Sequence, residues 1–156
     1  MYALFKLLHL AAVVVFLGNI ITGLFWHAHA ARSRDPKLLA NAMEGIIRSD
    51  QLFTVPGVIA IVATGIVAAI YGQLPILRTG WILWTIVLFS VSGLVFAFRV
   101  APLQRQLLAL ARTGATSLAF DFQRYRALTL RWELWGGIAL AAPTAGFALM
   151  VLKPAL

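Results

Sequence analysis

The sequence contains no cysteine among its 156 residues. Disulfide bonds, thiolate metal sites and cysteine nucleophiles are therefore excluded. Charge is scarce as well, because Asp, Glu, Lys and Arg make up only 12% of the chain, against about 25% in a typical soluble domain. No Ser–His–Asp set, Walker loop, HExxH or dinucleotide-binding fingerprint is present. These absences argue against ordinary hydrolytic and nucleotide chemistry.

Apolar residues, in contrast, make up 62% of the chain, and its mean hydropathy is +0.90. A soluble domain of this size could not bury so much apolar surface, so the composition indicates an integral membrane protein. The formal net charge of +8 fits basic loops beside a membrane better than a nucleic-acid interface, because the basic residues are not interleaved with exposed aromatic residues. We expect contact with the lipid bilayer and none with nucleic acid.

Four apolar segments are long enough to cross the hydrocarbon core of a bilayer, which takes about 20 helical residues. They must be helices, because a single strand in lipid would leave its backbone groups without hydrogen bonds. The sequence therefore predicts an all-α fold, a four-helix transmembrane bundle with one domain over residues 1–156. The predicted membrane helices cover residues 7–26, 51–72, 79–98 and 134–152.

Lys and Arg are distributed unevenly between the two sides of this predicted bundle. Ten lie in the connection between the first two helices and in the connection between the last two. The positive-inside rule places these ten on the cytoplasmic side, with both termini outside. All five acidic residues also belong to the cytoplasmic side, which leaves no carboxylate at the membrane centre. The basic residues on the outer side are Lys6, Arg78 and Lys153.

The two basic connections have the pattern of amphipathic helices. In the first, Asp35 suits an N-cap and Pro36 suits the first helical position. A similar pattern follows Pro102. We expect these helices to lie at the cytoplasmic interface or to cap the bundle, in contact with lipid headgroups or with a soluble partner. The apolar face of the first connection consists of Leu38, Leu39, Ala42, Met43, Ile46 and Ile47.

Small residues spaced four apart predict close packing between membrane helices. Pro143 lies within the fourth helix and is expected to kink it, because proline lacks a backbone donor. The predicted packing strips are Gly65 and Ala69 on the second helix, and Gly137, Ala141 and Ala145 on the fourth.

A histidine interrupts the apolar run of the first helix, in "FKLLHLAAVVVFLG". On a helix, His9 shares a face with Ala12, Phe16 and Gly23, so it should look toward a small-residue seam. Ionisable side chains in a membrane are costly, and each is a functional candidate. Imidazole is also the usual ligand of haem iron. Two interpretations are open: His9 binds haem iron, or it is a neutral histidine hydrogen-bonded to a backbone carbonyl or to water.

A second axial ligand is harder to assign, because no histidine follows residue 29. Met150 lies at about the same depth as His9, so a His/Met pair is geometrically feasible, with packing as its alternative role. Five-coordinate haem, or His9 from two subunits, would need no such partner. His27 and His29 lie about 200° apart around a helix, which does not suit one metal ion. We expect both at the cytoplasmic interface.

Other polar residues are candidates for membrane or interface roles. Asn19 is expected to hydrogen-bond across helices, with contact to a cofactor or quinone as the alternative. Asp50 is expected to cap the start of the second helix. Glu133 lies at the cytoplasmic interface, where Arg99 and Arg131 are the expected partners of these acids. Such residues form a belt of ion pairs or, alternatively, a site for a proton or a quinone headgroup.

Several motifs together resemble a bacterial family catalogued as predicted integral membrane proteins: "FLGNIITGLFW", "SDQLFTVPG", "GWILW", "VAPLQRQL" and "RWELWG". The resemblance covers nearly the whole chain and implies four helices in the bacterial inner membrane. The opening "FKLLHLAAVVVFLG" is more distantly similar to HemJ-type protoporphyrinogen oxidases and CopD-type copper proteins. In the HemJ type the matching histidine would bind haem b, and a later helix supplies a second Lys or His. Only His9 carries over, because the predicted helices two to four contain neither residue.

The leading hypothesis is an inner-membrane protein that binds one haem b through His9, for electron transfer or for oxidation of a porphyrin-type substrate. The alternative is a non-enzymatic accessory or scaffold subunit of a membrane complex, which needs no ligand at His9. A weaker alternative is a small transporter or copper-handling protein. Assembly as a homo-oligomer or within a larger membrane complex is compatible with each hypothesis.

Overall fold

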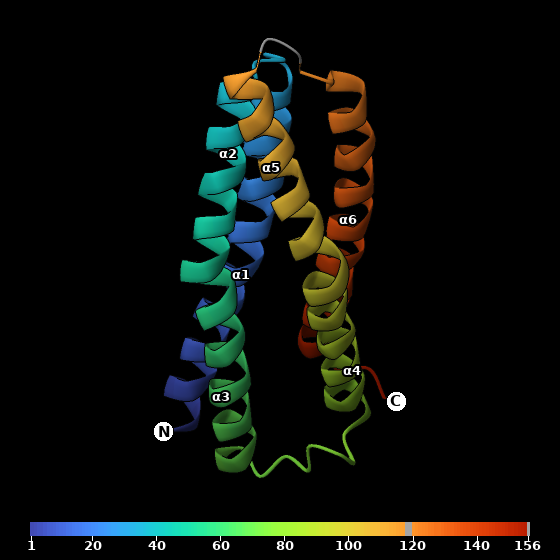
Figure 1. The fold of residues 1–156 in the computed structure, drawn as a ribbon. Coiled ribbons are helices and arrows are strands. Elements are labelled where there is room, and N and C mark those ends of the chain that lie inside the picture. The colour runs from blue at the N-terminus through green and yellow to red at the C-terminus, as the bar shows by residue number, and fades with distance from the viewer. Residues whose placement is uncertain (118–119, 156) are drawn as a thin grey trace.

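A computed structural model describes residues 1–117 and 120–155 of the chain. Its helices form four long rods, each long and apolar enough to cross a membrane (Figure 1). The predicted all-α membrane bundle is therefore confirmed. In chain order the elements are α1 (Tyr2–Ala31), α2 (Pro36–Ser49), the π-helical turn η1 (Asp50–Thr54), α3 (Val55–Tyr71), α4 (Gly80–Val95), the π-helical turn η2 (Phe96–Val100), α5 (Ala101–Thr116) and α6 (Phe122–Leu152).

The second and third rods are longer than the predicted membrane helices, because the amphipathic connections are continuous with them. The helix α2 runs through η1 into α3, and α4 runs through η2 into α5. Asp50 consequently lies inside a continuous helical rod, where the carbonyl of Asp50 accepts the backbone N–H of Val55. The prediction that Asp50 caps the start of a helix is therefore wrong.

Each π-helical turn lies just before a proline, with one residue between the turn and the proline. The backbone N–H of Val55 reaches the carbonyl of Asp50, and that of Ala101 reaches Phe96, five residues back in each case. Pro56 and Pro102 follow one position later. A proline ring in an ordinary α-helical turn clashes with the carbonyl four residues before it, and a wider turn relieves this clash. Each rod therefore passes its proline and stays helical.

The two ends of the molecule differ in what they contain. Both termini and the connection between α3 and α4 lie at one end, which we call the cavity end (Figure 1). The connection between α1 and α2 lies at the opposite end, together with the C-terminal part of α5 and the start of α6; we call this the core end. The structure thus places the termini together, as predicted. The assignment of the core end to the cytoplasm stays a prediction.

The main hydrophobic core lies toward the core end, where α2 packs against α5 and α5 packs against α6. Leu39 and Met43 of α2 and Leu107 and Ala111 of α5 are fully buried, with 0% exposure. The predicted apolar face of α2 is thereby confirmed for its central residues, whereas Leu38 is half exposed. The α2 and α5 helices therefore cap the bundle and hold its two halves together.

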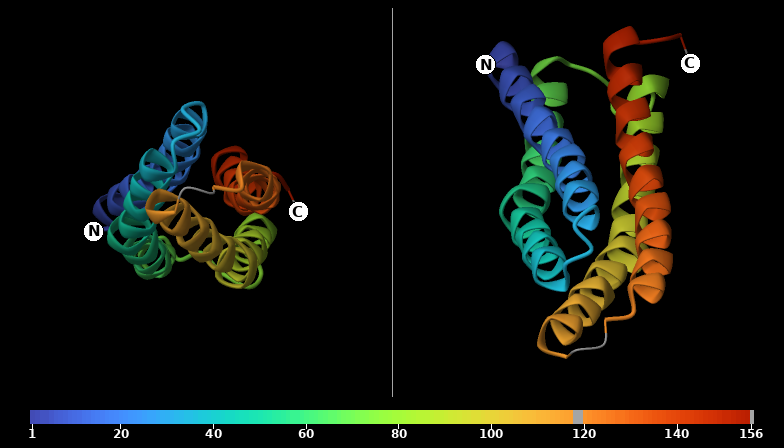
Figure 2. Two further views of the ribbon diagram at one scale, coloured as in Figure 1. Left: turned by 45° about the horizontal axis from the view of Figure 1, so that its top comes forward. Right: turned by 90° about the horizontal axis from the view of Figure 1, so that it is seen from above.

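Toward the cavity end the rods separate into two pairs. The first pair is α1 with α3, and the second is α4 with α6. Figure 2 shows these pairs as two separate layers, and α3 and α4 have no Cα atoms within 8 Å of each other. The outer surface of both pairs is apolar, since Leu7, Ile59, Leu94 and Leu134 are all more than half exposed. Such a surface suits lipid.

Within the second pair, α6 continues as a helix through Pro143. Proline has no backbone N–H, so the carbonyl of Ala139, four residues earlier, loses its helical donor. The hydroxyl of Ser92 on α4 donates to this carbonyl at 2.6 Å, and both residues are buried. A neighbouring helix thus satisfies the group that the proline leaves unpaired, as lipid cannot.

The packing face of α6 is not the one that the spacing of small residues predicted. Gly137, Ala141 and Ala145 are exposed on the outer surface. The buried face instead carries Gly136, Ala139, Pro143 and Gly146. At Gly146 a Cβ atom would come within 3.0 Å of the Thr85 methyl group, which shows how closely α6 approaches α4.

We expect Ser92→Ala to lower the free energy of unfolding by about 1 kcal/mol, because it leaves the buried Ala139 carbonyl without a donor. Denaturant titration in detergent micelles measures this. Ser90→Ala, on the same helix, is the matched control, because the exposed Ser90 hydroxyl makes no hydrogen bond among the described residues. Equal stability of the two variants would contradict the role given to Ser92.

Candidate functional site

A cavity of about 430 Å³ lies between the two helix pairs. Its volume falls in the range of about 300–1,000 Å³ that is usual for small-molecule sites. Side chains of α1, α3, α4 and α6 line it, and nearly all of them are apolar. The polar exceptions among the lining residues are His9, Thr85 and Ser90.

His9 lies in this cavity with one ring nitrogen already engaged. Its Nδ1 is 2.9 Å from the backbone carbonyl oxygen of Ile61 on α3. A carbonyl can only accept, so Nδ1 is the protonated nitrogen and donates this bond. The other nitrogen, Nε2, then carries a lone pair, and it makes no hydrogen bond within the described chain. The predicted bond to a backbone carbonyl is present, and it leaves Nε2 free to bind a ligand.

Gly65 of α3 provides the space for the His9 ring. A Cβ atom at this position would lie 3.0 Å from Cε1 and 3.1 Å from Nδ1 of His9. Any larger residue would push the ring away from the Ile61 carbonyl. The small-residue seam that the sequence predicts beside His9 is therefore present at Gly65.

Met150 lines the same cavity from α6, on the opposite helix pair from His9. The sequence placed the two residues at a similar depth, and the structure brings both to one site. Phe16 of α1 and Phe89 of α4 also line the cavity, with ring centroids 5.6 Å apart. These two rings lie on the core side of His9 and bridge the pairs, so they form the floor of the cavity.

Every charged side chain at the cavity end is basic. Lys6 precedes His9 on α1, Arg78 lies in the connection before α4, and Lys153 follows α6. The ammonium group of Lys153 lies 5.6 Å from the ring centroid of Trp81. None of the three lines the cavity, and the sequence places no Asp or Glu at this end, so the charge here favours an anionic ligand.

A polar network joins three of the rods on the core side of this floor. Asn19 of α1 donates through Nδ2 to Asp50 Oδ1 at 3.2 Å and to Thr54 Oγ1 at 2.9 Å. The Thr54 hydroxyl donates to Asp50 Oδ1 at 2.7 Å, and Gln104 Nε2 of α5 donates to Asp50 Oδ2 at 2.8 Å. Asn19 thus makes the expected bonds across helices. The sequence analysis did not identify Gln104, because no feature of the polar stretch around it indicates that its side chain is buried.

The predicted belt of ion pairs at the interface is wrong for the part of the chain that the structure describes. The guanidinium of Arg99 lies over the ring of Trp135, 5.3 Å from its centroid, and Glu133 is exposed. The single ion pair among the described residues joins Arg112 to Glu44 at 3.0 Å, on the surface. Arg99 and Glu133 therefore do not form a site together.

His27 is buried, which contradicts its predicted place at the interface. It is 0% exposed, its Nε2 lies 2.9 Å from the Tyr125 hydroxyl, and its ring meets Trp132 edge-on at 4.8 Å. His29 is exposed and stacks on Phe25. Within the described residues no group of three His, Cys, Asp or Glu side chains could hold a metal ion. Tyr125 and Trp132 lie seven residues apart on α6, so they share one helical face, and this spacing could have indicated an aromatic site for His27.

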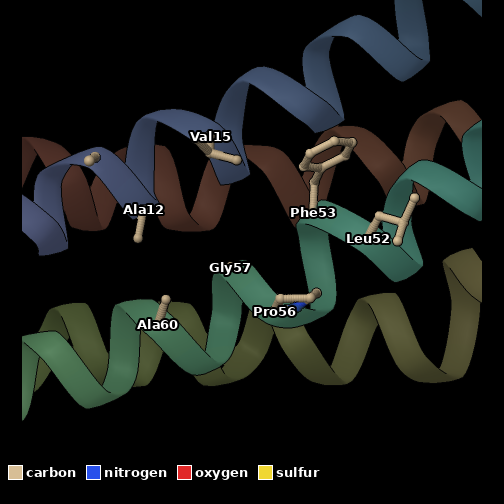
Figure 3. Close-up of a pocket in the computed structure, with 8 residues that line it drawn as sticks. Ala12, Val15, Leu52, Phe53, Pro56, Gly57 and Ala60 are labelled. Atoms are coloured by element: carbon tan, nitrogen blue, oxygen red, sulfur yellow. The ribbon is translucent and has the colours of Figure 1, made fainter.

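A second hollow of about 280 Å³ lies on the outer surface of α1 and α3 (Figure 3). It forms where η1 meets Pro56, and small residues such as Ala12 and Gly57 leave the space unfilled. Its lining contains no polar side chain. This hollow offers nothing but apolar contact, and the cavity at His9 is the better candidate for chemistry.

Comparison with known proteins supports the membrane assignment. No curated protein and no solved structure matches the chain significantly. The more distant resemblance of the opening segment to haem and copper proteins therefore stays a prediction. The family described as "Predicted integral membrane protein (DUF2269)" matches residues 3–154, nearly the full length. With four apolar helices and this match, the chain belongs to the DUF2269 family of predicted integral membrane proteins.

Proposed function

We propose that this protein binds one haem b in the cavity between its two helix pairs, with His9 Nε2 as an axial ligand, and transfers electrons within the membrane. One observation carries the proposal: the Ile61 carbonyl holds the Nδ1–H of His9 at 2.9 Å and leaves Nε2 unpaired at an apolar cavity. Histidines that bind metals characteristically donate their other N–H to a backbone carbonyl or carboxylate, which fixes tautomer and ring orientation.

The rest of the cavity fits a haem group in three respects. Its lining is apolar, as the macrocycle requires, and its volume is about 430 Å³. Met150 lines it from the helix pair opposite His9, and its thioether would be a second residue to hold the iron. Outside the cavity lining, Lys6, Arg78 and Lys153 give this end of the molecule a positive charge that would favour the carboxylates of haem.

Bound haem b would supply one-electron transfer. The residues of this chain would bind and tune it: His9 holds the iron, the Ile61 carbonyl orients His9, and the apolar walls exclude water. His9 is the one titratable side chain among the residues that line the cavity. Because no acid–base pair lies there, the cavity supports electron transfer better than oxidation of a porphyrin-type substrate. The bacterial inner membrane is the proposed location.

We expect purified wild-type protein to show a Soret band and sharp bands after reduction, and His9→Ala to lose them. Absorption spectra of oxidised and dithionite-reduced protein in detergent measure this. His29→Ala is the matched control, since His29 is exposed at the far end of α1. A colourless wild type, after expression with added haem precursor, would overturn the proposal and favour an accessory subunit.

Gly65→Leu should reduce the haem content strongly. A Cβ atom at position 65 lies 3.0 Å from Cε1 and 3.1 Å from Nδ1 of His9, so a leucine side chain would displace the His9 ring. Gly18→Leu is the control, since a Cβ atom there has nothing within 4 Å. Haem per protein is measured on fractions that are monodisperse by size exclusion and helical by circular dichroism. Equal haem content in the two variants would contradict the placement of haem beside His9.

Met150→Leu should lower the reduction potential and let carbon monoxide bind the reduced protein, because a thioether ligand raises the potential and fills the sixth position. A spectroelectrochemical titration and a spectrum under carbon monoxide test this. Met43→Leu, buried in the α2–α5 core, is the control. If wild type already binds carbon monoxide and Met150→Leu leaves the potential unchanged, Met150 is not a ligand.

A further inference from the structure

The polar network around Asp50 is separate from the proposed haem site, and its carboxyl group has no cationic partner. Asp50 is 8% exposed and lies in η1, where the apolar stretch of the second rod begins. The elements packed around it are α1, α2, α3 and α5. In the described chain no Lys, Arg or His on these elements forms an ion pair with Asp50. Arg48, two residues before Asp50, and Arg105, next to Gln104, are both exposed.

A buried carboxylate without a counter-charge is costly, and the cost rises in an apolar membrane segment. Neutral donors offset part of this cost. Asn19, Thr54 and Gln104 provide such donors, and no other side chain hydrogen-bonds to the carboxyl oxygens of Asp50 in the described chain. Binding a proton removes the charge altogether, provided that the added O–H finds an acceptor.

Gln104 can provide that acceptor without any movement of the helices. Its amide nitrogen lies 2.8 Å from Asp50 Oδ2, and a half-turn of the amide group puts the carbonyl oxygen in the same place. A protonated Asp50 then donates from Oδ2 to Gln104, while Asn19 and Thr54 still donate to Oδ1. The same four side chains thus satisfy both the charged and the neutral form.

We propose that Asp50 is a proton-binding site: it holds a proton at neutral pH and donates it in a hydrogen bond to the Gln104 carbonyl. When a water molecule accepts this proton, a half-turn of the Gln104 amide brings its N–H back to Asp50 Oδ2. The bond between Asp50 and Gln104 joins the rod α2–η1–α3 to the rod α4–η2–α5. Among the described residues, the other side-chain hydrogen bond between these rods joins the exposed pair Arg112 and Glu44. Proton exchange therefore occurs at the buried link between the two halves.

Infrared spectroscopy of the protein in lipid nanodiscs at neutral pH tests this directly. We expect the C=O stretch of a protonated carboxylic acid, with a downward shift in D2O, and its loss in Asp50→Asn. Asp35→Asn and Asp121→Asn are matched controls that keep the band, since both residues are helix N-caps near the surface. Thr54→Val should move the band to higher wavenumber, because it removes a donor to Oδ1.

Three results would overturn the proposal. They are the absence of the band in the wild type, its persistence in Asp50→Asn, and its loss when sodium chloride replaces potassium chloride, which would indicate a sodium site instead. The Asp50→Asn side chain has nearly the same shape and can still hydrogen-bond, and circular dichroism verifies its helical fold. The measurement needs no haem, so its outcome is independent of the proposed electron-transfer function.

Discussion

The packing of α2 against α5 is the interaction on which the rest of this structure depends. Leu39, Met43 and Leu107 are fully buried there, and the two rods meet at this core and not where α3 and α4 cross the apolar layer. Because the halves are joined at one end, they are free to separate at the other, and the cavity lies where they separate. A bundle that packed equally along its whole length would have no space beside His9.

A second constraint comes from the bilayer, which offers no hydrogen bonds to the backbone. The chain contains prolines in three of its four rods and satisfies the groups around them in two ways. Wide π-helical turns precede Pro56 and Pro102, and the Ser92 hydroxyl serves the carbonyl that Pro143 leaves without a donor. The π-helical turn η1 also places the Asp50 side chain where α1 and α5 can reach it. The adjustment for one proline and the polar network are therefore parts of the same feature.

The sequence predicted the four apolar helices, the amphipathic face of α2 and the inward-facing position of His9, because each depends on local periodicity or on one unusual residue. It did not predict what depends on contacts between distant segments. Small residues at spacing four occur on two faces of α6, and only packing against α4 decides which face is buried. The burial of His27 depends on Tyr125, 98 residues away in the chain. Likewise, charge alone suggested ion pairs for Asp50, whereas the structure gives it the uncharged partner Gln104.

The proposed function requires that a nitrogen of His9 binds haem iron in the cavity between the helix pairs. Electron paramagnetic resonance of the oxidised protein, prepared with 15N-labelled histidine, tests this bond directly. If His9 binds the iron, we expect strong hyperfine coupling from one histidine nitrogen, unchanged in His29→Ala and absent in His9→Ala. Haem iron without a coupled histidine nitrogen, or a preparation that contains no haem, would contradict it.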